Sequence, residues 1–248
     1  PDDRLRGAWT ASDGAAGRMT ASAGLHNLPV PLRPAVAAEP GFVFVRADLG
    51  QIEPRVLAAV SGDAAFAEAT LADDLYAPVA AKLRVERSVA KIAVLAAMYG
   101  QRSGAAGEAL RDLQRAYPVA MGLLDEAYAA GLARRPLRTF GGRLIRLDSA
   151  LAPEAGQPVG EGWDAARGRF ARNAIIQGAA AELFKAWAAT VRHHLPSHGG
   201  QIVLCLHDEL LLHVPVEASE AVAALVHQAL TDSSRRWVGA SAGPPVRF

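Results

Sequence analysis

Two acidic positions in distant parts of this chain each follow an apolar, β-prone segment. Asp48 ends the segment FVFVRAD at residues 42–48, and the triplet His207-Asp208-Glu209 stands between QIVLCL and LLLHVP. Short runs of β-branched and aromatic residues are typical of strands. Each carboxylate therefore stands where a strand would stop. The pattern constrains the chain to a sheet, parallel or hairpin, that could hold the two carboxylates side by side.

Paired carboxylates on rigid strands favour a site for divalent cations. Two-metal phosphoryl transfer needs cations about 3.5–4 Å apart, so that the attacking and leaving oxygens are both stabilised. Magnesium prefers carboxylate and water oxygens, and substrate phosphates complete its shell. Taken alone, each aspartate has a simpler explanation, because polar residues are common in the turns that follow strands.

One predicted helix carries cations and an aromatic residue at regular spacing. Arg87, Lys91, Leu95 and Tyr99 follow one another at steps of four residues and so share one helix face. Two cations and a ring on one face suit a nucleoside triphosphate, because Arg supplies a planar fork and Lys a point charge for the phosphates. The alternative is an amphipathic helix whose basic residues only face water.

Composition limits the class of protein without naming its activity. The 248 residues carry 26 Lys and Arg against 25 Asp and Glu, so net charge gives no nucleic-acid signature. The single cysteine, Cys205, excludes an internal disulfide and is typical of a reducing compartment. The first residues of the sequence show no basic-plus-apolar signal pattern, and no apolar run reaches membrane-spanning length. We therefore expect a soluble cytoplasmic protein with no membrane partner.

The periodicity of apolar residues, and the Gly and Pro residues that end helices and strands, predict both helices and strands. Strands are expected over residues 42–48 and on both sides of residues 207–209, and a turn between short strands at residues 139–143. Helices are expected over residues 54–60, 74–99 with a break near residues 83–84, 104–131 with an interruption near residues 117–118, 168–195 and 218–239. Residues 152–162 are expected to form a loop.

Five short motifs follow one another along the chain. They are GRMTAS with HNLP at residues 17–22 and 26–29, DLGQIEPR at residues 48–55, RSVAK with LAAMYG at residues 87–91 and 95–100, RFARN with QGAAAE at residues 169–173 and 177–182, and HDE at residues 207–209. Their content and order resemble the palm and fingers region of family A (DNA polymerase I-like) DNA polymerases. The resemblance covers nearly the whole chain, and some substitutions resemble a divergent actinobacterial exonuclease/polymerase branch.

The resemblance implies an α+β fold, a right-hand polymerase palm with a small antiparallel sheet and helices, joined to helical fingers. Residues 1–53 would form the first part of the palm and residues 54–148 the fingers. Residues 149–248 would form the second part of the palm, with the metal-site hairpin and the C-terminal helix. The family's thumb is missing or truncated in this sequence.

The implied function is template-directed DNA synthesis, in which deoxynucleotides are added to a primer 3′ end by two-metal-ion nucleotidyl transfer. Two Mg²⁺ ions, with Mn²⁺ as a substitute, would be the cofactors. Primer–template DNA and deoxynucleoside triphosphates would be the partners. We expect a monomeric, nucleoid-associated enzyme of DNA replication or repair.

The resemblance also implies roles for individual residues. Asp48 and Asp208 would hold the metal ions, and the catalytic set is Asp48, Asp208, Glu209 and Lys91. Nucleotide binding would involve Gln51, Glu53, Arg87, Lys91, Leu95, Tyr99 and His207. DNA binding would involve Arg18, Asn27, Tyr99, Gly100, Arg169, Asn173, Gln177 and His207. Asn and Gln amides suit the minor-groove acceptors that all base pairs share, and the Glu53 carboxylate would exclude a ribonucleotide 2′-hydroxyl.

Several positions depart from the family pattern. Leu49 and Gly50 replace the usual Tyr-Ser, and Leu95 with Ala96 replaces an aromatic residue followed by Gly. Tyr76 stands where a phosphate-assisting His is usual, and Cys205 where a Gln usually approaches the primer. These departures put nucleotide stacking and sugar discrimination in doubt.

Three alternatives to a DNA polymerase remain. A non-catalytic or weakly active DNA-binding polymerase-like domain would explain why the departures cluster near the nucleotide. A single-subunit RNA polymerase would need room for a 2′-hydroxyl, which Glu53 should deny. A nuclease using the same metal pair would leave Arg87 and Lys91 without a triphosphate to bind.

Overall fold

The computed structural model describes residues 4, 6–12, 16–21, 28–100, 106–147, 161–239 and 243–248. The chain forms two compact units. The first, which we call the sheet unit, comprises residues 1–50 and 181–237. The second, the helical unit, comprises residues 51–180 and 238–248. The described residues 161–180 thus group with residues 51–147, whereas sequence analysis assigned them to the second part of the palm.

The sheet unit is built on a three-stranded antiparallel sheet in which β7 (Glu209–Pro215) lies between β3 (Phe42–Asp48) and β6 (Gln201–Leu206). Across β3 and β7, Asp48 pairs with Glu209 and Phe42 with Pro215. Residues 207 and 208 form the two-residue turn between β6 and β7, a hairpin loop length that requires positive φ. His207 supplies it, with φ of 43°. The expected hairpin is confirmed, and its pairing is antiparallel.

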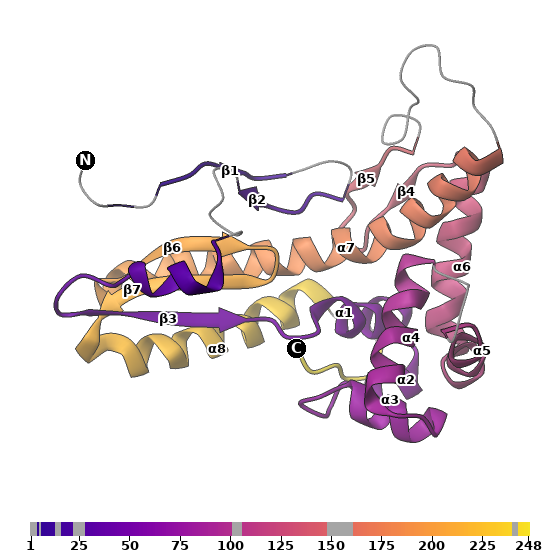
Figure 1. Cartoon of the computed structure of the whole chain (residues 1–248), viewed down its shortest axis with the longest axis horizontal. Coiled ribbons are helices and arrows are strands. Elements are labelled where there is room, and N and C mark those ends of the chain that lie inside the picture. Colours follow the sequence, from indigo (N-terminus) through magenta and orange to yellow (C-terminus); the bar gives the residue numbers. More distant parts are fainter. Residues whose placement is uncertain are drawn as a thin grey trace, which may run out of the picture. The chain divides into compact units, whose positions relative to one another are not determined.

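Residues 181–194 of helix α7 (Glu161–His194), together with helix α8 (Ser219–Val238), form the rest of the core of the sheet unit. Figure 1 shows α8 and the C-terminal part of α7 alongside the three strands. Trp187 on α7 is buried, and its indole N–H donates to the backbone carbonyl of Val226 on α8 at 3.0 Å. Alternate β7 residues Leu210, Leu212 and Val214 are fully buried. Burial of these apolar side chains is the main force that assembles the unit.

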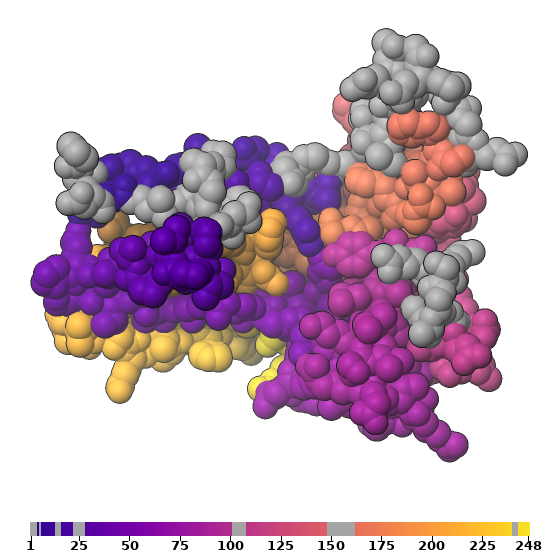
Figure 2. Space-filling model, in the orientation of Figure 1, coloured from indigo at the N-terminus to yellow at the C-terminus, as the bar shows by residue number. Residues whose placement is uncertain are grey.

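The N-terminal segment adds short elements to the sheet unit. Strands β1 (Trp9–Thr10) and β2 (Thr20–Ala21) pair antiparallel, and a 3₁₀ helix, η1, spans Val30–Ala35. In Figure 2 the indigo atoms of this segment lie against the orange atoms of the C-terminal half of the unit. The Lys185 ammonium on α7 donates to the carbonyl of Gly17 at 2.6 Å, which holds the segment to the helix.

The helical unit contains six helices before α7 among its described residues. They are α1 (Ile52–Ser61), α2 (Ala64–Ala69), α3 (Tyr76–Leu83), α4 (Arg87–Tyr99), α5 (Ala106–Ala116) and α6 (Pro118–Leu132). A short antiparallel pair, β4 (Leu137–Arg138) and β5 (Leu144–Ile145), follows them.

One buried carboxylate caps two of these helices. Asp63 precedes α2 and accepts a hydrogen bond from the Phe66 backbone N–H at 3.0 Å. Its other oxygen accepts from the N–H groups of Val119 and Ala120, each at 3.1 Å, at the start of α6. Backbone N–H groups in the first turn have no partner within the helix, and a carboxylate also stabilises the positive end of the helix dipole. Asp63 therefore fixes α2 against α6.

The observed elements agree with most sequence predictions. The helix breaks fall at Arg84 and Tyr117, as expected. Helix α7 begins at residue 161, seven residues before the predicted start at 168, and residues 152–160 of the predicted loop lie outside the described residues. The small antiparallel sheets with many helices confirm the α+β class. Among the described residues, every helix is too short or too polar to span a bilayer.

Candidate active site

The sheet unit brings Asp48 and Asp208 together. Asp48 is the last residue of β3, and Asp208 lies in the turn directly before its cross-strand partner Glu209. The Leu49 backbone N–H donates to the Asp208 carbonyl at 2.9 Å, so the pairing continues one residue beyond the strand. The main chain of both aspartates is therefore held at the same end of the sheet.

The two carboxylates also influence each other electrostatically. The pKa of Asp208 is raised above its ordinary value, mainly by burial and then by repulsion from the Asp48 carboxylate. His207 and Arg18 act in the opposite direction, which places both within electrostatic range of Asp208. A neighbouring divalent cation would relieve repulsion between two carboxylates. Among the described residues there is no cluster of three or more metal-ligating side chains, so the arrangement is a pair of aspartates.

Glu209 is bound by a residue that sequence analysis did not select. The Arg46 guanidinium donates from Nε to Glu209 Oε1 at 2.8 Å and from Nη2 to Glu209 Oε2 at 2.9 Å. The same Nη2 lies 2.9 Å from Asp48 Oδ2. Residues two apart on a strand share a face, so Arg46 could have been identified from its spacing to Asp48. The pKa of Arg46 is raised further by this contact with Glu209.

In the helical unit, α4 presents the predicted stripe. Arg87, Lys91 and Tyr99 are exposed and Leu95 is half-buried, so all four occupy the solvent-facing side of the helix. The opposite side is buried and consists mainly of alanines, with Val94 and Met98. The spacing thus predicted correctly which residues share a face, although it does not test their role.

Arg87 is not a free cation in this structure. Its Nε lies 2.5 Å from Asp74 Oδ2, and its Nη2 lies 3.1 Å from Asp74 Oδ1. Asp74 Oδ1 also accepts from the Gln51 amide at 3.0 Å, and the Gln51 side-chain oxygen accepts from the Leu75 N–H at 2.9 Å. The contact with Arg87 is the largest cause that lowers the pKa of Asp74. Sequence analysis missed Asp74, because no helical or strand period relates it to Arg87.

Tyr76, which stands where the family pattern has a His, lies beside the Arg87–Asp74 pair. The Arg87 guanidinium lies over its ring, 5.6 Å from the centroid. Burial raises the pKa of the Tyr76 hydroxyl, and the Glu53 carboxylate is the second cause. The structure therefore gathers Gln51, Tyr76 and Arg87 around Asp74 within the helical unit, and Glu53 acts electrostatically on Tyr76.

The α7 residues selected for DNA binding also lie in the helical unit. Arg169 is exposed, and Asn173 and Gln177 are half-buried. The Asn173 side-chain nitrogen is buried and has no hydrogen-bond partner among the residues that the structure describes. Gly100 ends α4 with φ of 71°, and a Cβ there would lie 3.0 Å from Arg169 Cγ, so the two positions are in contact. Asn27 lies outside the described residues.

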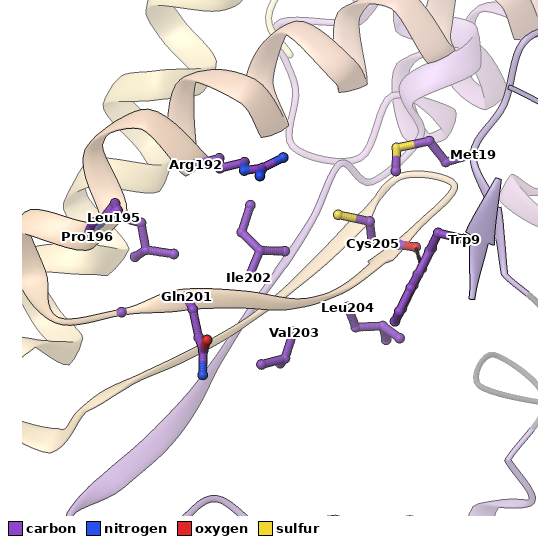
Figure 3. Close-up of a pocket in the computed structure, with 11 residues that line it drawn as sticks. Trp9, Met19, Arg192, Leu195, Pro196, Gln201, Ile202, Val203, Leu204 and Cys205 are labelled. Carbon is purple, nitrogen blue, oxygen red and sulfur yellow. Dashed lines mark hydrogen bonds between the residues drawn. The ribbon is translucent and has the colours of Figure 1, made fainter. Parts of the chain in front are cut away.

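Cys205 lines a cavity of about 470 Å³ in the sheet unit, together with Trp9, Met19 and Arg192. Figure 3 shows the Trp9 ring beside the backbone of Cys205, where the indole N–H donates to the Cys205 carbonyl at 3.0 Å. Burial raises the pKa of the Cys205 thiol. Cys205, at the position where the family pattern has a Gln, thus presents a half-buried thiol beside an indole.

Comparisons with known proteins agree with these observations. The family described as DNA polymerase family A matches residues 1–238. DNA polymerase I of Chloroflexus aurantiacus is 31% identical over 265 residues, which cover 94% of this chain and 27% of that protein. The thermostable DNA polymerase I of Thermus aquaticus is 30% identical over 258 residues, covering 92% of this chain and 30% of that protein.

The fold has a solved counterpart. The POL domain of Pol1 from M. smegmatis, in a complex with DNA primer-template and dNTP, aligns with a TM-score of 0.80 at 24% identity. The alignment covers 94% of this chain and 46% of that chain, and it shows that the fold is shared. The chain spans less than a third of the length of the two relatives named above.

Proposed function

The chain belongs to DNA polymerase family A, and we propose that it provides the palm and fingers of a template-directed DNA polymerase that extends primer 3′ ends. Residues 1–53 and 149–248 would serve as palm and residues 54–148 as fingers. The observation that carries the proposal is the placement of Asp48 and Asp208 at one end of the β3–β7–β6 sheet, joined by the Leu49 to Asp208 hydrogen bond.

The aspartate pair fits a divalent cation. Burial and repulsion from Asp48 raise the pKa of Asp208. A bound Mg²⁺ or Mn²⁺ would offset that repulsion, so the pair of carboxylates favours binding of a divalent cation. Asp48 and Asp208 would hold two such ions. When bound, the ions supply Lewis-acid stabilisation of the attacking 3′ oxygen and the leaving pyrophosphate.

The exposed face of α4 would bind the incoming nucleotide. Arg87 would exchange its Asp74 carboxylate for the triphosphate, and Lys91, on the next turn, would neutralise or protonate the leaving pyrophosphate. Tyr99 would lie beside the templating base, and Leu95 would contact the nucleotide without the usual ring. Closure of this helix around a correct pair would supply induced-fit selection.

Other residues would position the sugar and the duplex. Glu53 would exclude a 2′-hydroxyl, and Gln51 would support the nucleotide site through Asp74. Arg169, Asn173 and Gln177 would contact the minor groove of primer–template DNA. Arg18 would approach the same minor groove, and His207 would lie near the primer terminus or the incoming phosphates; both residues act on Asp208 electrostatically. We propose a monomer that works on DNA in the cytoplasm.

The test is primer extension by the full-length protein with Mg²⁺, each deoxynucleotide being omitted in turn. Extension should stop at the omitted base. Asp208→Asn should reduce the rate at least about 100-fold while leaving DNA affinity unchanged, because Asn retains the shape but not the charge that holds a cation. Asp232→Asn, which changes a partly exposed carboxylate on α8, is the matched control.

The alternatives give different results in the same assay. DNA binding without extension would favour the non-catalytic domain. Ribonucleotide incorporation by the wild-type protein would indicate an RNA polymerase. If the protein is a DNA polymerase, the wild type should reject ribonucleotides and Glu53→Ala should incorporate them. Shortening of the primer without added nucleotide would indicate a nuclease.

A further inference from the structure

We propose that Arg46 is a built-in counter-cation of the acidic site, which withdraws Glu209 from metal binding and lowers the divalent-cation affinity of the Asp48–Asp208 pair before nucleotide arrives. The inference rests on the proposed function of that pair. Arg46 is a positioning residue in this proposal, since it acts through the carboxylates.

The geometry commits Arg46 to the acidic site. Its guanidinium makes a two-point contact with Glu209, at 2.8 and 2.9 Å, and a third contact with Asp48 at 2.9 Å. The register makes this possible, because Asp48 pairs directly with Glu209 while Arg46 precedes Asp48 by two residues on the same face of β3. One side chain thus bridges the two strands that carry the acidic residues.

Two consequences follow for a cation. First, both carboxylate oxygens of Glu209 are used by the guanidinium, which is planar and matches a carboxylate at two points. Second, a cation that binds Asp48 comes close to the Arg46 guanidinium, which already donates a hydrogen bond to one oxygen of the Asp48 carboxylate. Arg remains charged at any pH at which the protein is folded. The repulsion is therefore permanent and must lower cation affinity.

The contact is also reversible. The Arg46 side chain is 61% exposed and that of Asp48 is 42% exposed, whereas Glu209 is 23% exposed. Water and salt reach the guanidinium, so the Asp48 contact can open at little cost. A triphosphate that arrives with its own negative charge would offset the repulsion, so cation binding would become strong only with nucleotide present.

The experiment measures Mn²⁺ binding to the full-length protein by calorimetry, without DNA or nucleotide. Arg46→Gln keeps a polar side chain but removes the charge, and it should raise Mn²⁺ affinity by about three- to tenfold. Arg46→Lys keeps the charge and should bind Mn²⁺ like the wild type. Arg235→Gln removes an exposed charge on α8 in the same unit and should leave Mn²⁺ affinity unchanged.

A second variant should change Mn²⁺ affinity in the opposite direction. Glu209→Gln frees the whole Arg46 charge to act on Asp48, so Mn²⁺ affinity should fall by about the same factor. Glu209→Gln also keeps the proposal testable if Arg46→Gln does not fold. The gain in Arg46→Gln should shrink as salt rises, because exposed charges are screened.

The outcomes separate this inference from the proposed function. Equal or weaker Mn²⁺ binding by Arg46→Gln, with binding lost in Asp208→Asn, overturns the role of Arg46 and leaves the metal pair intact. Absence of Mn²⁺ binding in the wild type and in every variant overturns both proposals.

Discussion

The Asp74 carboxylate holds the Arg87 guanidinium at two points, with Nε 2.5 Å from Oδ2 and Nη2 3.1 Å from Oδ1. The residue that we propose to bind the triphosphate is thus paired with a carboxylate in this structure. A triphosphate presents the same kind of oxygen acceptors with more charge. Nucleotide binding would then be an exchange of partners at Arg87, and Asp74 keeps the guanidinium oriented until the exchange occurs.

Arg87→Ala should raise the KM for deoxynucleotides about tenfold or more, because hydrogen bonds to charged groups contribute about 1.5–3 kcal/mol. DNA affinity should not change. Steady-state primer extension measures both quantities. Arg111→Ala, which removes an exposed guanidinium from α5 with only a 3.8 Å contact to Glu108, is the control. An unchanged KM in Arg87→Ala would argue against a triphosphate contact.

The raised pKa of Asp208 predicts a pH-dependent stability. A carboxyl group whose pKa is higher in the folded state binds more protons there than in the unfolded chain. Its contribution is therefore complete below about pH 3.9, the usual Asp pKa, and is lost as pH rises through the raised value. Metal-free Asp208→Asn should gain stability over the wild type across this window. Melting in EDTA from pH 4 to 8 measures the difference, and a pH-independent difference would contradict the prediction.

Arg55→Ala should destabilise the protein although Arg55 belongs to the DLGQIEPR motif. The side chain is buried, and its guanidinium donates to the carbonyls of Thr70, Ala72, Asp73 and Arg247 at 2.6–3.0 Å. Each buried acceptor left unpaired costs about 1–3 kcal/mol. We expect a loss of about 3 kcal/mol in the free energy of unfolding, measured in urea.

The control for Arg55 is Arg235→Ala, which removes a largely exposed guanidinium whose contact with Asp232 is 3.9 Å long. Exposed ion pairs contribute little, so its stability should change by less than about 0.5 kcal/mol. Equal effects of the two substitutions would show that the Arg55 contacts are not stabilising.

Two glycines of α6 should respond to alanine in opposite directions. A Cβ on Gly131 would lie 2.7 Å from the Arg167 carbonyl oxygen and 2.7 Å from Gly168 Cα, both backbone atoms of α7. Gly131→Ala should therefore cost about 1–3 kcal/mol. Gly122→Ala, in open space on the same helix, should stabilise by about 0.5–1 kcal/mol. Thermal denaturation of both variants tests the packing of α6 on α7, and a stabilised Gly131→Ala would refute it.

Local patterns predicted a large part of this structure. The apolar segments before Asp48 and Asp208 predicted two strand ends, and the sheet places both aspartates together. The four-residue steps from Arg87 to Tyr99 predicted one exposed helix face, and α4 has it. Such patterns work because side-chain direction repeats every two residues in a strand and every 3.6 in a helix.

The residues that contact the functional side chains were harder to predict from the sequence. Arg46 stands two residues before Asp48, but its bond to Glu209 spans 163 positions. Asp74 lies 13 positions from Arg87, with helix α3 between them, and Asp63 binds backbone N–H groups that are 56 and 57 positions away in the sequence. None of these distances corresponds to a repeat of local structure.

The amino-acid sequence by itself determined the family, the order of the motifs, the strand that ends at Asp48 and the exposed stripe of α4. Those features depend on neighbours in the chain, whose relative directions are fixed by backbone geometry. Only the tertiary structure decided which charge meets which: Arg46 with Glu209, Arg87 with Asp74, and Arg55 with backbone carbonyls. Long side chains can reach many partners, and the register of the sheet and the packing of the helices select one of them.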